Sequence, residues 1–89
     1  MGTLTLNDGT VLQNSYALLS NGILFVYVQQ EGITLAEVFN LLVDPDNTSV
    51  IVYTQVNGDE VTYERYEKLR AVRDEGDGLF TAVLERMAI

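Results

Sequence analysis

Hydrophobic and polar positions alternate along most of this chain at the period of two that is typical of β-strands. Polar turns interrupt the alternation at Asn7-Asp8-Gly9, Asn21-Gly22 and Asn57-Gly58, and such Asn-Gly and Asp-Gly pairs suit tight hairpin turns. A bulge or bend is expected at Asn14-Ser15, where the strand-forming pattern weakens. The pattern predicts strands over residues 3–6, 10–20, 23–29, 49–56, 61–66, 66–74 and 79–84.

The strand predicted over 23–29 is apolar on both of its faces. Ile23, Phe25 and Tyr27 occupy one face, and the even-numbered residues from Leu24 to Val28 occupy the other. A strand with this pattern is expected to be covered on both sides or to lie at the centre of its sheet. We therefore expect it to be the central strand of the hydrophobic core.

The period changes to a helical one only once. Thr34-Leu35-Ala36-Glu37 matches a capping box, in which the threonine hydroxyl and the glutamate carboxylate satisfy each other's backbone amides. Pro45 limits the helix, because the residue before a proline disfavours the helical conformation. The spacing predicts a helix over 35–43 with one apolar face, made by Leu35, Val38, Phe39 and Leu42.

Residues 66–74 fit two structures. Glu67 to Val72 has a helix-forming composition, but Leu69, Ala71 and Arg73 alternate as in a strand. The glycine-containing turn that follows and the strand over 79–84 favour a closing hairpin. The expected fold is a single α+β domain over residues 1–89, with a mainly antiparallel sheet, one short helix packed on a face and the order β-β-β-α-β-β-β-β; a β-grasp-like arrangement is the alternative.

Composition excludes several kinds of chemistry. The 89 residues include no Cys, no His and no Trp, so a disulfide, a thiol nucleophile, a histidine base and the usual zinc ligands are all missing. Asp44-Pro45-Asp46-Asn47-Thr48 offers oxygen ligands for calcium, but its spacing fits a turn better than a calcium loop. We expect no cofactor, no metal and no enzyme activity, and catalysis by carboxylates alone is the least favoured reading.

Charge is divided unevenly along the chain. Acids outnumber bases 13 to 5, which gives a net charge of -8. Residues 1–64 hold eight of the acids and no base. This surface would repel nucleic acid and anionic lipid. No signal peptide and no membrane-spanning segment is expected, because the longest apolar run, Ile23 to Val28, is far shorter than a spanning helix.

Tyrosines supply five of the eight aromatic residues, and all five fall on predicted strands. Tyrosine and arginine are enriched where proteins contact one another. The one place where aromatic and cationic residues mix is the candidate interface Tyr63, Arg65, Tyr66 and Arg70. The alternative is ordinary packing at the rim of the sheet.

Several features together resemble small proteins encoded in phages and prophages of Gram-positive gut bacteria. They are the Asn-Gly and Asp-Gly hairpins, the short helix, the run Leu41-Leu42-Val43-Asp44-Pro45-Asp46-Asn47-Thr48, and Tyr66-Glu67-Lys68-Leu69 before a final hairpin. The likeness spans residues 3–86. It implies a place in the cytoplasm of a bacterial host cell or in a virion, and it implies no site residues.

Two functions remain open. The first is a non-enzymatic interaction or structural module that binds a protein partner, self-association included, because a domain of this size buries a limited core and exposed strand edges offer a route to association. The second is an acidic decoy that mimics nucleic acid and occupies a basic host protein, which the acids of residues 1–64 suggest.

Overall fold

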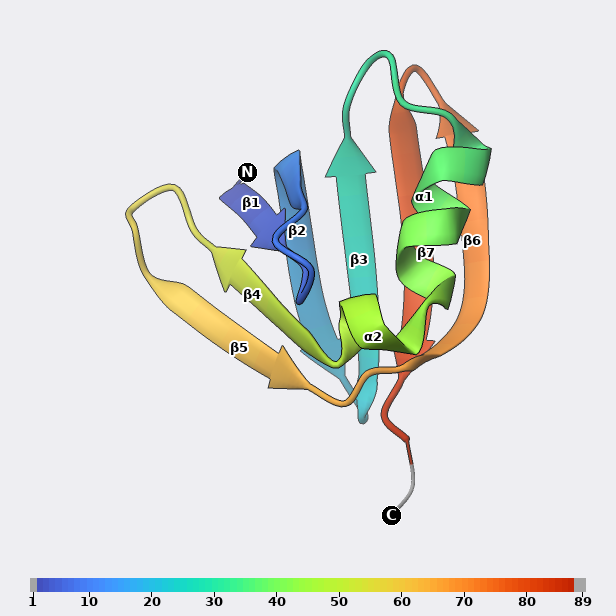
Figure 1. Cartoon of the computed structure of the whole chain (residues 1–89). Helices are drawn as coiled ribbons and strands as arrows, with labels where there is room; N and C mark the ends of the chain where they lie inside the picture. Colours follow the sequence, from blue (N-terminus) through green and yellow to red (C-terminus); the bar gives the residue numbers. More distant parts are fainter. Residues whose placement is uncertain (1, 88–89) are drawn as a thin grey trace.

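One antiparallel sheet with two helices on one of its faces makes up the protein. The computed structural model describes residues 2–87. Its seven strands lie in the order β5-β4-β1-β2-β3-β7-β6 (Figure 1). The predicted α+β class and order are confirmed, and a second short helix is added. The elements are β1 (Gly2–Thr5), β2 (Val11–Ser20), β3 (Ile23–Gln29), α1 (Leu35–Val43), α2 (Pro45–Thr48), β4 (Val50–Thr54), β5 (Glu60–Glu64), β6 (Lys68–Gly76) and β7 (Leu79–Glu85).

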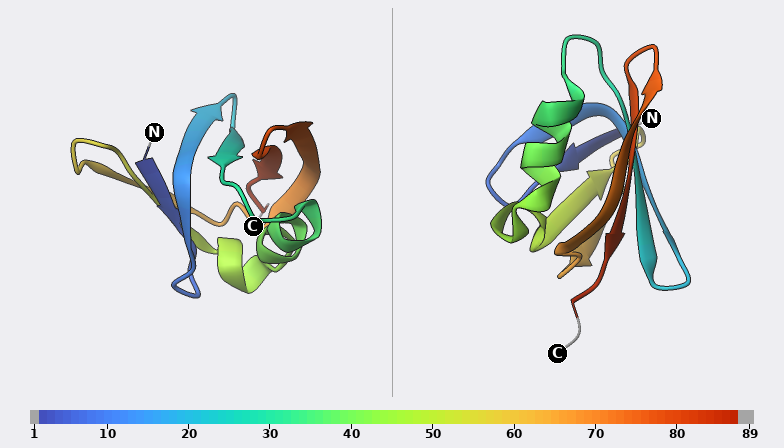
Figure 2. Two further views of the ribbon diagram at one scale, coloured as in Figure 1. Left: turned by 90° about the horizontal axis from the view of Figure 1, so that it is seen from above. Right: turned by 90° about the vertical axis from the view of Figure 1, so that its right-hand side faces the viewer.

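The sheet curves until its two edge strands approach each other at one end. β5 and β6 lie at opposite edges, yet only residues 65–67 separate them, and four Cα steps cover at most about 15 Å. The Arg65 amide donates to the carbonyl of Ser49 at 2.9 Å, and its carbonyl accepts from the amide of Met87 at 2.9 Å. This linker therefore ties the β4 side of the sheet to the end of β7, and Figure 2 shows the resulting curved shape from above.

β2 changes direction at the predicted bulge. Asn14 has a φ of 51°, and the pairing of β1 with β2 shifts register between Gly2 and Leu4. Beyond the bulge, residues 15–20 of β2 pair with β3, whereas β1 reaches only as far as Ser15. Among residues 2–87, the second half of β2 is thus paired along one side alone.

Helix α1 begins and ends where the sequence predicts. Thr34 accepts from the Glu37 amide at 3.1 Å, and the Glu37 carboxylate accepts from the Thr34 amide at 3.2 Å. The predicted apolar face is only half right: Val38 and Leu42 are buried, but Leu35 and Phe39 are exposed. The helix lies over β6 at the edge of the sheet (Figure 1). The sheet therefore covers only part of the apolar face that the sequence predicts for this helix.

Helix α2 was not predicted. Asp44 caps it, because the Asp44 carboxylate accepts from the Asp46 amide at 3.0 Å, and Pro45 stands in its first turn. Proline fits the first position of a helix, since its missing amide has no partner there in any case. Pro45 therefore ends α1 as expected and also starts a second helix. The local turn expected at Asp44 is confirmed.

The capping box is expected to stabilise the protein measurably. Thr34→Ala removes the acceptor for the Glu37 amide, and loss of an N-cap side chain costs about 1 kcal/mol. We expect the free energy of unfolding, measured by urea denaturation with circular dichroism, to fall by about this amount. Thr34→Ser keeps the hydroxyl and should stay close to wild type; an equal loss in both variants would contradict the capping role.

Candidate interaction surface

The face of β3 that points away from the helices has no covering layer among residues 2–87. Leu24, Val26 and Val28 are buried on the helix side, whereas Ile23, Phe25 and Tyr27 are half-buried on the other. Both helices lie on one side of the sheet, as Figure 2 shows in its side view. Of the two alternatives predicted for this strand, a place in the interior of the sheet is the one confirmed. β3 therefore carries more apolar side chains than this fold buries.

Cross-strand pairs extend this uncovered face over three strands. Phe25 pairs with Leu18 of β2 and with Val83 of β7, and residues directly opposite in a sheet share a face. Tyr27 pairs with Tyr16 in the same way. A shallow hollow of about 240 Å³ lies between Phe25, Tyr27 and Val83 on this side. We call this surface of Tyr16, Leu18, Phe25, Tyr27 and Val83 the outer face.

The half of β2 beyond the bulge is the second unusual feature. Residues 16–20, which we call the open edge, pair with β3 on one side, and no other strand in the described part of the chain pairs with them. Leu18 and Leu19 are each 44% exposed there. They are adjacent on a strand, so their side chains point to opposite faces.

Charge protects the other edges of the sheet but not the open edge. Sheet edges are usually guarded against pairing with other chains by charged residues. β5 carries Glu60 and Glu64, and β6 carries five charged residues, whereas residues 9–30, which include all of β2 and β3, carry none. The open edge therefore has none of the side chains that normally prevent strand addition.

The five tyrosines form two groups of neighbouring rings. The ring of Tyr16 lies 6.0 Å from the ring of Tyr27 and 5.5 Å from that of Tyr53, measured between centroids. The rings of Tyr63 and Tyr66 meet edge to face, 6.1 Å apart. Tyrosine presents a large apolar ring with a polar tip, which suits a surface that is wet when free and covered when bound.

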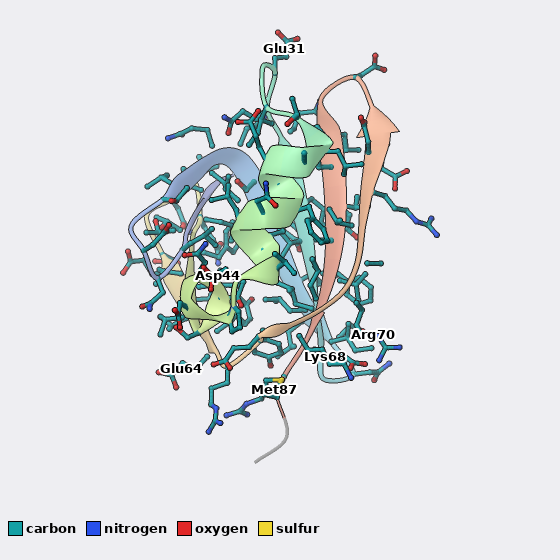
Figure 3. All side chains as sticks on the ribbon, turned by 45° about the vertical axis from the view of Figure 1, so that its right-hand side comes forward. Glu31, Asp44, Glu64, Lys68, Arg70 and Met87 are labelled. Carbon is teal, nitrogen blue, oxygen red and sulfur yellow. The ribbon has the colours of Figure 1, made fainter. Side chains whose placement is uncertain are left out.

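The structure brings two of the four residues of the predicted interface into one hollow. Tyr63 and Tyr66 share a hollow of about 320 Å³, whose lining does not include Arg65 or Arg70. Arg70 lies on β6 and binds the Glu85 carboxylate at 2.9 Å. Figure 3 shows Arg70 at the end of the sheet where the linker crosses.

The structure places Tyr66 in a different role from the one predicted for it. Tyr66 lies in the linker instead of on a strand, and it is only 7% exposed. Arg65 stands beside it with a φ of 71°. Tyr66 is buried because the linker closes the curved sheet at this point. Of the predicted set, Tyr63 and Tyr66 are brought together, and Tyr66 packs in the core.

The environment of Tyr63 has a consequence at high pH. Partial burial, followed by the nearby Tyr16, Tyr53 and Tyr66, raises the pKa of Tyr63. The unfolded chain then ionises this phenol at lower pH than the folded protein does, so stability falls as the pH rises above about 10. In urea denaturation at pH 7 and pH 11, Tyr63→Phe should lose less stability over this interval than wild type. Equal losses in the two proteins would contradict the shift.

Comparison with models of known protein families, with curated proteins and with solved structures found no match for this chain. None of the described helices is long and apolar enough to cross a membrane.

Proposed function

We propose that this protein is a non-enzymatic interaction module that binds another protein through the outer face and the open edge. The observation that carries the proposal is β3, whose second apolar face has no covering layer in the described structure. Exposed apolar surface of this kind marks contact sites in folded proteins. Tyr16 and Tyr27, which belong to the outer face, are of the residue type that contact surfaces favour.

The absence of charged residues from β2 and β3 supports this proposal. The chain has a net charge of -8, yet residues 9–30 are uncharged. Charged residues are depleted at the centres of protein interfaces and common around them.

The resemblance of the sequence to small phage and prophage proteins leads us to propose a phage or prophage context, with the protein in the bacterial cytoplasm or in a virion.

The acidic decoy is the second candidate. Eight acids and no base lie in residues 1–64, and Figure 3 shows three of them, Glu31, Asp44 and Glu64, spread from one end of the molecule to the other. A decoy would bind a basic protein through these charges. Its binding would weaken steeply with salt, because exposed charges are screened beyond about 8 Å at physiological ionic strength.

One variant and one salt series separate the candidates. Proteins captured from a Gram-positive bacterial lysate are identified, purified and titrated against wild type and Leu18→Lys. An interaction module predicts binding that survives 1 M salt and weakens at least tenfold in the variant. Binding lost in salt and indifferent to Leu18→Lys would support the decoy. Light scattering over a hundredfold concentration range tests self-association, and a monomer with no captured protein would overturn the proposal.

A further inference from the structure

The main-chain groups of the open edge point in a predictable direction. Ser20 and Ile23 flank the turn Asn21-Gly22, whose φ values are 52° and 76°. The residues that flank a two-residue hairpin turn of this kind form a hydrogen-bonded pair, and such pairs alternate along an antiparallel ladder. Leu18 and Tyr16 therefore also direct their main-chain groups toward β3. Ala17 and Leu19 direct theirs to the other side.

The amides and carbonyls of Ala17 and Leu19 thus face a side where none of the described strands follows. Ser15 has the same orientation, and it is opposite Gly2 of β1 in the register. Beyond that point, within residues 2–87, no turn or side-chain hydrogen bond reaches Ala17 or Leu19. Two donors and two acceptors are therefore available in a row, with the spacing that an added strand requires.

A groove lies beside these groups. The hollow of about 320 Å³ has Leu19 on one side and Val61, Tyr63 and Tyr66 on the other. A second hollow at the opposite end of the open edge lies between Tyr16 and Tyr53. The two hollows therefore lie at the two ends of the open edge, and Glu64 and Arg86 also line the one beside Leu19. We call these two hollows and the open edge between them the groove.

We propose that this groove accepts an extended segment of a partner polypeptide, which adds to β2 as a further strand. This inference rests on the proposed function and deepens it. Main-chain hydrogen bonds to Ala17 and Leu19 would hold the segment, and alternate apolar side chains would enter the hollow beside Leu19. The open edge itself carries no charge, so the part of the segment that pairs with Ala17 and Leu19 would be uncharged. A side chain that enters the hollow beside Leu19 would also meet Glu64 and Arg86.

A single segment fits this place better than a second folded copy of the chain. Neighbouring strands lie about 4.8 Å apart, so one segment needs the width of one strand. A second copy would bring its own β3, which follows β2 after a two-residue turn, one strand further out. β5 limits that space, because its Val61 and Tyr63 line the hollow beside Leu19.

Leu18 and Leu19 offer a matched pair of variants. Both are leucines on one strand and both are 44% exposed, but Leu19 lines the groove and Leu18 belongs to the outer face. A displayed library of random seven-residue peptides is selected on wild type alone, with no selection against either variant. The best peptide is synthesised, and its affinity for wild type, Leu18→Lys and Leu19→Lys is measured by calorimetry.

The groove predicts a peptide that loses at least tenfold in affinity with Leu19→Lys and less than twofold with Leu18→Lys. Every second backbone amide of the bound peptide would face β2. N-methylation of one of the two alternating sets of amides should therefore also lower the affinity at least tenfold. In wild type, the amide signals of Ala17 and Leu19 should shift on binding more than that of Leu18, a readout that does not depend on either variant folding.

Other results overturn the groove. If no peptide is enriched, or if the enriched peptide responds to Leu18→Lys and ignores Leu19→Lys, the groove is wrong; in the second case the outer face, and with it the proposed function, survives. If neither variant changes the affinity of the peptide, both the groove and the outer face are excluded as its binding site. A doubled solution mass that Leu19→Lys abolishes would identify a second copy as the occupant, against the proposal.

Discussion

Tyr66→Ala is expected to lower the free energy of unfolding by about 3–5 kcal/mol, as for other large aromatic side chains removed from a core. Tyr66 is only 7% exposed and belongs to the buried cluster. It stands next to Arg65, whose main chain bonds to both Ser49 and Met87. The variant thus leaves a cavity where the two edges of the sheet meet. Since small domains are stable by about 5–15 kcal/mol, it should unfold at much lower urea.

Two further substitutions control this result. Tyr66→Phe keeps the ring and should change stability by less than about 1 kcal/mol. Tyr16→Ala removes the same side chain from a position that is 37% exposed, so a loss of about 1 kcal/mol is expected there. Urea denaturation followed by circular dichroism gives all three values. A loss in Tyr66→Ala no greater than that in Tyr16→Ala would mean that the linker does not close the fold.

Features set by neighbouring residues could be predicted from the sequence. The capping box placed α1 correctly because its hydrogen bonds join residues three apart. The bulge at Asn14 and the turn at Asn21-Gly22 were also predicted, because Asn and Gly adopt positive φ at little cost. The ambiguous segment 66–74 is confirmed as largely strand, β6, and the alternation that favoured this choice is itself a local signal.

Features set by the curvature of the sheet could not be predicted in this way. The burial of Tyr66 depends on β5 and β6 being brought together by the linker, although they lie at opposite edges. No pattern in residues 61–74 contains that information. The uncovered face of β3 depends on where the helices pack, and the alternation of β3 is the same whether a second layer exists or not.

The open edge did leave a signal in the sequence. Residues 9–30 form a long uncharged stretch in a chain with 18 charged residues, 13 acidic and 5 basic. The predicted interface was sought instead where tyrosine and arginine mix, at Tyr63, Arg65, Tyr66 and Arg70. That criterion found two residues beside the groove, Tyr63 and Tyr66. It missed Leu19, because an exposed leucine on a strand has the same pattern as a buried one.

Gly2→Ala is the second substitution with a large expected effect. A Cβ built at Gly2 would lie 1.8 Å from the carbonyl oxygen of Thr54 and 2.8 Å from its carbonyl carbon. Both atoms belong to the main chain, so no side chain can rotate away. Thr3 and Thr54 are paired in the register of β1 and β4, and the methyl group would force these strands apart. We expect a loss of about 3 kcal/mol, at the upper end of the range for overpacking.

Gly9→Ala makes the same chemical change without the clash. Gly9 has a φ of +90° and open space around its Cβ position, so Ala there meets only the cost of a positive φ, about 1–2 kcal/mol. Urea denaturation compares the two variants, and amide exchange locates the damage. In Gly2→Ala, exchange should accelerate in β1 and β4 while β7 stays protected. If Gly2→Ala costs no more than Gly9→Ala, the close approach of β1 and β4 is absent in solution.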